Sequence, residues 1–258
     1  MNDKMARVKC FLLDMDGTIC LDNDVFEGAV DAVERMKSRG QVLFLTNNSS
    51  KTASGYIDKL NGMGFNVTSD NIYTSAMAAA YYLNRRYNGA KTYIFANKNV
   101  KEEFSAAGVN IEENNPDLVL VAFNTTFDYD ELEKLCGFIR RGVPFICTHD
   151  DINCPTVAGY KPDVGSYLAL IEKSTGRKPA AVCGKPYEIM GKCISGKYAL
   201  KPEEIAMFGD RLATDIKFGC NNNFVTTLVL TGEATRDDAA KSGLNIDFVL
   251  DSICEWDK

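Results

Sequence analysis

Apolar and polar residues follow two different rhythms along this chain. Short apolar runs with few polar interruptions cover residues 8–14, 41–47, 92–96, 117–123, 144–149, 204–210 and 224–230. Runs of this length are typical of strands buried on both faces of a sheet. Segments with the spacing of an amphipathic helix cover residues 29–40, 52–64, 75–87, 100–108, 130–142, 165–176, 187–199 and 212–221. Several of them end at a glycine, the residue favoured just after a helix.

The alternation of strands and helices predicts the fold class. Strand–helix–strand units imply right-handed crossovers and a mostly parallel sheet. We therefore expect an α/β fold with a Rossmann-like, doubly wound core. About 140 residues separate Thr46 from Lys185, several times the roughly thirty residues of one βαβ unit. This excess predicts an inserted α/β cap domain over residues 80–180, with residues 1–79 and 181–258 forming the core.

The composition narrows the possible partners and the compartment. With 258 residues, 45% hydrophobic and 25% charged, the chain resembles an ordinary globular protein. A net charge of −6 argues against nucleic acid and an anionic membrane surface as partners, but a small anionic substrate is compatible because a bound metal reverses the local charge. Nine cysteines lack metal-finger spacing, and we see no signal peptide and no apolar run of about twenty residues. We therefore expect a reducing, cytoplasmic setting.

Polar residues of catalytic type stand where predicted strands end. They are Asp14 and Asp16 in DMDGT, Thr46 and Asn47 in LTNN, Lys185 in CGKP, and Asp210 and Asp215 in GDRLATD. Open parallel sheets bind ligands beyond the carboxyl ends of their strands, so we expect these residues to converge on one crevice. Each motif alone has a plainer interpretation as a turn or a helix cap. All four together, in this order, indicate a catalytic site.

The carboxylates are suited to a magnesium ion. Residues two apart in an extended chain project from one face, so Asp14 and Asp16 repel each other unless a cation intervenes. Mg²⁺ prefers oxygen ligands, and we expect Asp14, Asp210 and the backbone carbonyl of Asp16 to bind it. Asp215 is expected to support this metal shell. An ionised Asp14 then acts as a nucleophile, while Asp16 transfers protons.

The remaining core candidates are suited to phosphate. Thr46 offers a hydroxyl and, with Asn47, neighbouring backbone N–H groups, and Lys185 offers a cation. Donors of this kind stabilise the charge on transferring phosphoryl oxygens. We therefore predict phosphate-binding roles for these three residues and a small phosphorylated metabolite as the substrate.

These four motifs resemble those of the haloacid dehalogenase superfamily of aspartate-nucleophile phosphohydrolases. Its DxDGT motif is matched by residues 14–18, its second motif by Thr46, its lysine by Lys185 and its GDxxxTD motif by residues 209–215. The resemblance covers essentially the whole chain. It implies a Mg²⁺-dependent phosphomonoesterase that forms an aspartyl-phosphate on Asp14.

The position of the predicted cap and the phrases LTNNSS, GRKP, CGKP and GDRLATDI resemble the class IIA subfamily. This subfamily includes NagD-like nucleotide phosphatases and bacterial p-nitrophenyl phosphatases. The resemblance implies activity on sugar phosphates, nucleoside monophosphates and, in vitro, p-nitrophenyl phosphate. Dimers through the cap are common in the subfamily, so a homodimer is implied as well, although the residues themselves decide neither the oligomeric state nor the preferred substrate.

The one histidine lies in the predicted cap, in the loop CTHDDINCP. We expect the cap to select the substrate, with His149, Asp151 and, in the following segment GYKPDVGSY, Lys161 as candidate contacts. The loop also fits local turn chemistry, and Lys161 also fits simple solvation. A zinc site at His149 lacks a recognised ligand spacing.

Other activities of such a scaffold differ in specific residues. Carbon–halogen hydrolysis needs no aspartate two residues after the nucleophile, so Asp16 and Asp210 argue against it. A phosphomutase or other phosphotransferase differs only in the acceptor of the phosphoryl group, and this alternative stays open. A non-enzymatic metabolite-binding regulator would usually have lost a motif, and none is lost here.

Overall fold

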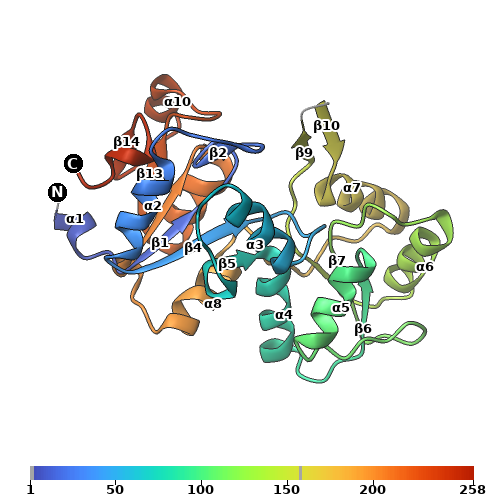
Figure 1. Cartoon of the computed structure of the whole chain (residues 1–258). Coiled ribbons are helices and arrows are strands. Elements are labelled where there is room, and N and C mark those ends of the chain that lie inside the picture. The colour runs from blue at the N-terminus through green and yellow to red at the C-terminus, as the bar shows by residue number, and fades with distance from the viewer. Residues whose placement is uncertain (1–2, 157–158) are drawn as a thin grey trace. The chain divides into compact units, whose positions relative to one another are not determined.

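The computed structural model describes residues 3–156 and 159–258, and the chain folds into two units (Figure 1). Unit 1 contains the residues up to 46, 53–73 and 185–258, and unit 2 contains residues 47–52 and 74–184. Each unit is built on parallel strands joined by helices. The predicted α/β class is therefore confirmed. Among the described residues, no helix is long and apolar enough to cross a bilayer.

Unit 1 holds a six-stranded sheet with the order β14-β13-β12-β1-β4-β5. Its strands are β1 (Cys10–Leu13), β4 (Gln41–Thr46), β5 (Ile72–Thr74), β12 (Ile205–Gly209), β13 (Val225–Val229) and β14 (Phe248–Leu250). The central strand β1 is buried along its whole length and pairs in parallel with β4 and β12. Leu13 lies opposite both Phe44 and Phe208. The segments that follow these three strands therefore leave the sheet at the same edge.

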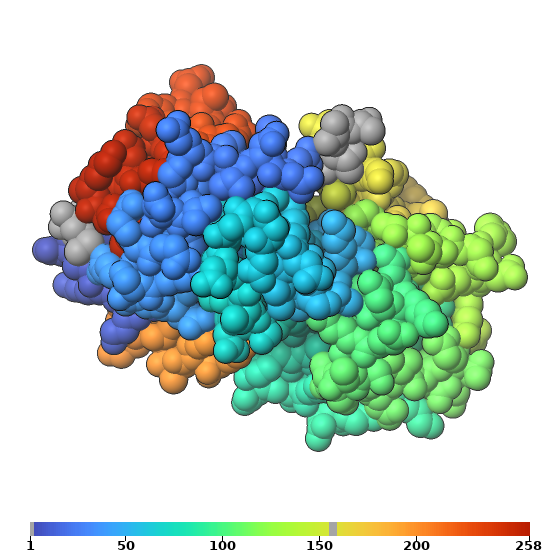
Figure 2. All heavy atoms as spheres, in the orientation of Figure 1, coloured from blue at the N-terminus to red at the C-terminus, as the bar shows by residue number. Residues whose placement is uncertain are grey.

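Helices and short turns connect the strands of unit 1. They are α1 (Asp3–Ala6), the hairpin of β2 (Cys20–Leu21) and β3 (Asp24–Val25), α2 (Ala29–Lys37), α3 (Ala53–Gly62), η1 (Ser69–Asn71), α8 (Glu188–Tyr198), η2 (Pro202–Glu204), η3 (Leu212–Ile216), α9 (Lys217–Asn222), α10 (Arg236–Lys241) and η4 (Ile253–Glu255). Helix α2 buries Ala29, Ala32, Val33 and Met36, which share one helix face. These side chains join the apolar cluster that also contains Phe11 of β1. The opposite face of α2 is exposed, and the helix lies at the surface in Figure 2 (blue).

Unit 2 holds its own four-stranded parallel sheet with the order β11-β8-β7-β6. Its elements are α4 (Ser75–Arg86), β6 (Thr92–Phe95), α5 (Lys98–Ala106), β7 (Leu118–Val121), α6 (Tyr129–Arg140), β8 (Phe145–Cys147), the antiparallel hairpin of β9 (Asn153–Thr156) and β10 (Gly159–Pro162), α7 (Val164–Thr175) and β11 (Ala181–Val182). A separate apolar cluster that includes Tyr93, Phe95 and Phe138 fills this unit. Unit 2 therefore has a core of its own.

The units divide the chain at residues other than those we predicted. Residues 74–79, 181–184 and 47–52, which we placed in the core, belong to unit 2. Thr74 caps helix α4 by accepting a hydrogen bond from the Met77 N–H, at 3.1 Å. Strand β11 pairs with β8 of the same unit. Local capping and strand pairing thus draw these residues into unit 2.

Several elements lack the periodic pattern on which the sequence interpretation relied. Strands β5, β11 and β14 have only two or three residues each, too few for a pattern to stand out. The hairpin of β9 and β10 is polar, and every residue of β10 is exposed. The helix predicted over 212–221 begins instead as the π-helix η3 and continues as α9. Deviations of this kind from regular helix are frequent at functional sites.

Candidate active site

Asp14 follows β1 and lies against a buried lysine. Its Oδ1 is 2.5 Å from Nζ of Lys185, and the same ammonium lies 2.7 Å from Oδ1 of Asp215. All three side chains are buried. Burial by itself would lower the pKa of Lys185, but the charges of Asp14 and Asp215 outweigh it and raise that pKa. Lys185 is therefore held as a cation between two carboxylates.

A third carboxylate completes the cluster. Oxygen atoms of Asp14, Asp210 and Asp215 all lie within 4.8 Å of one another. Burial and the charges of Asp14 and Asp215 raise the pKa of Asp210 to about 7. Burial and Asp14 also raise the pKa of Asp215, and Lys185 partly offsets them. Three neighbouring carboxylates, two of them paired with one ammonium, form a site with excess negative charge.

One oxygen of Asp210 has no hydrogen-bond partner within residues 3–156 and 159–258. Oδ2 accepts a hydrogen bond from the Glu233 N–H at 2.8 Å, but Oδ1 is buried and bonds to none of the described residues. An unsatisfied buried carboxylate oxygen is costly unless an ion or water satisfies it. Together with the neighbouring carboxylates, this oxygen fits a divalent cation with oxygen ligands.

Two glycines allow the backbone to approach Asp210 closely. Gly17 has a φ of +91°, and a Cβ on it would lie 2.3 Å from Oδ2 of Asp210. A Cβ on Gly232 would lie 2.0 Å from the same oxygen. Only glycine leaves room for the carboxylate at either position. The Thr231 hydroxyl in turn donates to the carbonyl of Gly17 at 2.6 Å, so the segment after β13 holds both the DxDGT loop and Asp210.

The sequence interpretation did not include Thr231, Gly232 or Glu233. These residues follow the predicted strand at 224–230 and stand at the same edge of the sheet as Asp14 and Asp210. Their position after that strand was the available signal. Thr231 and Gly232 are not acidic, and no known motif spacing includes Glu233, which contributes only its backbone N–H here.

Asp16 differs from Asp14 in its surroundings. Its side chain is 53% exposed and pairs with Lys59 of α3 at 3.7 Å. Partial burial raises the pKa of Asp16, while Lys59 lowers it and the charge of Asp14 raises it. Strand β1 ends at Leu13, and backbone N–H groups of residues 18–20 fold back onto the carbonyl of Met15. A turn therefore begins at Met15, and Asp16 lies within it.

The phosphate-binding candidates fall in different units. Thr46 is the buried last residue of β4 in unit 1, and Lys185 lies in the same unit. Asn47 belongs to unit 2, where its Nδ2 donates to Oδ2 of Asp151 at 3.1 Å. The unit 1 cluster therefore contains Lys185 but neither Asn47 nor Asp151.

The cap candidates have unlike surroundings. His149 is completely buried, and both of its ring nitrogens are hydrogen-bonded, Nδ1 to Thr148 Oγ1 at 3.0 Å and Nε2 to Asp163 Oδ1 at 2.9 Å. Contact with a leaving group would break one of these bonds. Lys161 lies in the exposed strand β10. Carboxylate oxygens of Asp151 and Asp163 lie within 4.8 Å of the His149 ring, but the ring nitrogens are already engaged.

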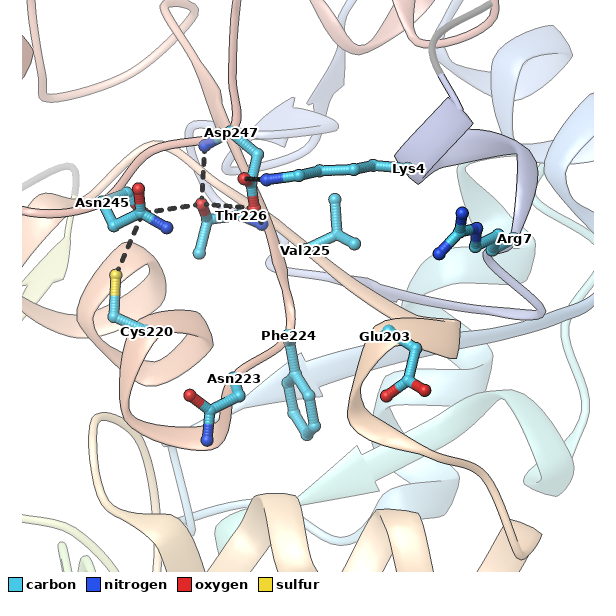
Figure 3. A pocket seen from close by; sticks show the side chains of 10 residues that line it. All are labelled: Lys4, Arg7, Glu203, Cys220, Asn223, Phe224, Val225, Thr226, Asn245 and Asp247. Carbon is cyan, nitrogen blue, oxygen red and sulfur yellow. Dashed lines mark hydrogen bonds and ion pairs between the residues drawn. The ribbon is translucent and has the colours of Figure 1, made fainter.

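A separate hollow of about 410 Å³ lies at the opposite edge of the unit 1 sheet (Figure 3). It is lined by Lys4, Arg7, Glu203, Cys220, Asn223, Phe224, Val225, Thr226, Asn245 and Asp247. Val225 is the first residue of β13, whereas Asp210 follows the last residue of the parallel strand β12. The hollow and the carboxylate cluster therefore lie at opposite ends of these strands. It contains none of the predicted site residues.

Comparison with known proteins identifies the family. Residues 11–110 match the model for haloacid dehalogenase-like hydrolases, and residues 182–256 match a second HAD-hydrolase-like model. The chain is 32% identical over 253 residues to the 5'-nucleotidase YutF of Bacillus subtilis, covering 98% of each protein. The chain belongs to the haloacid dehalogenase phosphatases. The phosphatase is also 32% identical to the ribonucleotide monophosphatase NagD of Escherichia coli, over 97% of this chain and 98% of that protein.

A solved structure extends the similarity to the whole fold. The 4-nitrophenylphosphatase from Thermotoga maritima is 40% identical, covers 98% of each chain and has a TM-score of 0.93. The predicted class IIA, NagD-like subfamily is confirmed. The protein is accordingly a phosphoric monoester hydrolase that acts on small phosphorylated metabolites. A divalent metal is the usual cofactor of this family, and the carboxylate cluster fits one.

Proposed function

We propose that this phosphatase transfers the phosphoryl group of its substrate to Asp14 and then to water, with Mg²⁺ as its cation. The unpartnered Oδ1 of Asp210, beside Asp14 and Asp215, is the observation that carries this proposal. Asp14, Asp210 and the backbone carbonyl of Asp16 would hold the ion, and Asp215 would support it. The bound cation offsets the negative charge of the carboxylates and the phosphate.

Asp14 attacks the phosphorus atom in the first step. Its carboxylate forms a new bond to phosphorus, and the bond from phosphorus to the leaving oxygen breaks. Lys185 lies 2.5 Å from Oδ1 of Asp14 and offers a positive charge to the phosphoryl oxygens. Thr46 and Asn47 donate hydrogen bonds to the same oxygens in this proposal.

Asp16 moves the protons. It donates one to the leaving oxygen in the first step, and in the second step it removes one from the water that attacks phosphorus. That attack breaks the bond to Asp14 and releases inorganic phosphate. The half-exposed side chain of Asp16 supports this role, because a proton carrier must reach water and the leaving group. Lys59 would orient the carboxylate from α3.

Unit 2 is the cap that selects the substrate in this proposal, with Asp151 and Lys161 as candidate contacts and His149 acting without touching the substrate. Peptide bonds join Asn47 and Gly184 of unit 2 to Thr46 and Lys185 of unit 1, respectively. Asp151 accepts a hydrogen bond from Asn47 through Oδ2, and its Oδ1 accepts none from the described residues. A free carboxylate oxygen there would accept a hydrogen bond from a sugar or ribose hydroxyl.

The same carboxylate would disfavour substrates that carry a second carboxylate near the phosphate, because like charges repel. We therefore rank sugar phosphates and nucleoside monophosphates above phosphoglycolate. A steady-state panel of these compounds, with pyridoxal phosphate included, tests the ranking through kcat/KM. Equal values for all of them would refute a selective role for Asp151.

The nucleophile is tested by phosphate release from p-nitrophenyl phosphate in the presence of Mg²⁺. Replacing Asp14→Asn is expected to lower kcat by about three orders of magnitude or more, because the attacking carboxylate is lost. Asp58→Asn, at an exposed position of α3, is the matched control and should retain activity. Activity of Asp14→Asn close to that of the wild type would refute the assignment. Measuring free phosphate against phosphorylated product also separates hydrolysis from phosphoryl transfer to a second metabolite.

We further propose a cytoplasmic setting and a homodimer without nucleic-acid or membrane partners. None of the nine cysteines forms a disulfide bond, which suits a reducing compartment. The net charge of −6 suits neither nucleic acid nor an anionic membrane. Light scattering coupled to gel filtration tests the dimer, and a single mass near 28.5 kDa would contradict it.

A further inference from the structure

A continuous chain of hydrogen bonds runs through the interior of unit 2. The Phe123 N–H donates to Ser49 Oγ at 2.9 Å, and Ser49 Oγ lies 2.9 Å from Thr148 Oγ1. Thr148 Oγ1 lies 3.0 Å from His149 Nδ1, and His149 Nε2 lies 2.9 Å from Asp163 Oδ1. Ser49, Thr148 and His149 are completely buried and Asp163 is 3% exposed. Water therefore does not compete for these bonds.

The two ends of this chain determine where its protons lie. A backbone N–H can only donate, so Ser49 Oγ accepts from Phe123, and the carboxylate of Asp163 can only accept. A neutral His149 ring then carries its proton on Nε2, where Asp163 accepts it, and Nδ1 is the acceptor. Thr148 donates to Nδ1 and accepts from the Ser49 hydroxyl. In this arrangement every donor in the chain has an acceptor.

The chain joins parts of unit 2 that are distant in sequence. Ser49 lies in the segment 47–52, and Thr148 opens the loop that follows β8. Asp163 caps α7 by accepting from the Val164 N–H at 2.7 Å. The loop is tied to the segment 47–52 a second time by the bond between Asn47 and Asp151, at 3.1 Å.

The loop is also fastened to helix α7. The Gly165 N–H donates to the carbonyl of Asp151 at 2.8 Å. A Cβ on Gly165 would lie 2.3 Å from the carbonyl oxygen of Asp150, so only glycine permits this close approach. The backbone of Asp151 is therefore held by α7, while its side chain is held by Asn47.

We propose that His149 is a positioning residue that holds Asp151 beside Asn47. It acts through Thr148 and Asp163 and does not touch the substrate. The segment 47–49, which contains a proposed phosphate ligand, and the loop 148–151, which contains the proposed selecting carboxylate, then form one rigid piece. This inference rests on the proposed roles of Asn47 and Asp151. The inference accounts for a buried histidine whose two ring nitrogens are both hydrogen-bonded.

The first test reads the proton position directly. Because the chain has a single histidine, a long-range ¹H–¹⁵N correlation spectrum of the ¹⁵N-labelled phosphatase contains one imidazole pattern. We expect the pattern of a neutral ring protonated on Nε2 in the protein without substrate. A ring protonated on Nδ1 would overturn the proposal. This result does not depend on the identity of the nucleophile.

The second test separates positioning from general stability. Thr148→Val keeps the shape of the side chain but removes the hydroxyl that links Ser49 to His149. Thr148→Ser retains that hydroxyl. We expect Thr148→Val to lower the ratio of kcat/KM for a nucleoside monophosphate to that for p-nitrophenyl phosphate by about tenfold, the worth of one buried hydrogen bond. p-Nitrophenyl phosphate has no hydroxyl that Asp151 could bind, so it serves as the reference substrate.

Thr148→Ser should restore the ratio, and Thr175→Val, at the end of α7, should leave it at the wild-type value. An unchanged ratio in Thr148→Val would overturn the proposal. Failure of the proposed nucleophile would be seen separately, as activity retained by Asp14→Asn. If Thr148→Val does not fold, the tautomer measured on the native protein still decides whether the chain exists.

Discussion

The carboxylate cluster of unit 1 and the histidine chain of unit 2 are built alike but differ in how their polar atoms are satisfied. Both follow a buried parallel strand, β1 in one unit and β8 in the other. In unit 1, three carboxylates lie close together, two of them bonded to the Lys185 ammonium, and Oδ1 of Asp210 is left without a partner among the described residues. In unit 2, both nitrogens of His149 have partners.

This difference distinguishes a reacting site from a supporting one. Burial and the like charges of Asp14 and Asp215 raise the pKa of Asp210 to about 7, because negative charge exceeds positive charge in the cluster. A ligand that supplies positive charge therefore binds there favourably. The buried chain around His149 has no such deficit, and its stability comes from completed hydrogen bonds. Variants of the two regions should therefore respond differently to metal and to unfolding.

The largest effect is expected from Asp210→Asn. Losing a metal-ligating carboxylate should reduce Mg²⁺-dependent hydrolysis of p-nitrophenyl phosphate by about a thousandfold. The same change should stabilise the metal-free protein, because it removes charge from a crowded cluster. Since the pKa of Asp210 is raised in the folded state, its contribution to stability is lost as the pH rises through about 7.

Melting curves in EDTA at pH 8 and pH 5.5 check this prediction. The variant should melt about 2–4 °C above the wild type at pH 8, the shift expected for roughly 1 kcal/mol in a chain of this size. The gain should be smaller at pH 5.5. A lower melting temperature at pH 8 would mean that the carboxylate cluster is not under electrostatic strain.

Gly232→Ala should weaken metal binding. The added Cβ would lie 2.0 Å from Oδ2 of Asp210 and would displace that carboxylate. Changes to groups that orient metal ligands typically cost 10- to 100-fold in affinity, and we expect a loss of about this size. Titration of the melting temperature with MgCl₂ measures it. Gly62→Ala, at the end of α3 where a Cβ meets no atom within 4 Å, is the control.

Thr231→Val should have a smaller effect in the same direction. It removes the 2.6 Å hydrogen bond to the carbonyl of Gly17 and loosens the loop that carries Asp16. We expect about a tenfold weaker affinity for Mg²⁺. Thr231→Ser keeps the hydroxyl and should bind the metal as the wild type does. Equal affinities in the valine and serine variants would contradict this role.

His149→Leu should affect stability and leave the metal response unchanged. It leaves Thr148 and Asp163 without their buried partner, at a cost of about 1–3 kcal/mol. Urea unfolding of the metal-free protein measures the loss. The increase in melting temperature on adding MgCl₂ should equal that of the wild type. A smaller increase in the variant than in the wild type would show that the two regions are energetically coupled. It would contradict the distinction between a reacting region and a supporting one.

Local patterns were sufficient for the main elements of both units. The apolar runs before Asp14 and Asp210 became the buried strands β1 and β12, because a short chain with no polar position must be covered on both faces. The polar residues after them met at one edge, because parallel strands carry their carboxyl ends together. The short strands β5 and β14 and the polar hairpin of β9 and β10 lacked such a pattern and were not predicted.

The sequence by itself determined the longer strands and helices, the four motifs and the family, because apolar runs and motif spacings are local properties. Only the tertiary structure decided that Lys185 lies between Asp14 and Asp215, that Gly232 lies against Asp210, and that Oδ1 of Asp210 has no partner in the part of the chain that the structure describes. It also decided that His149 is buried with both nitrogens engaged. These features depend on contacts between residues far apart in the chain, and the distances within them appear only when the strands have paired.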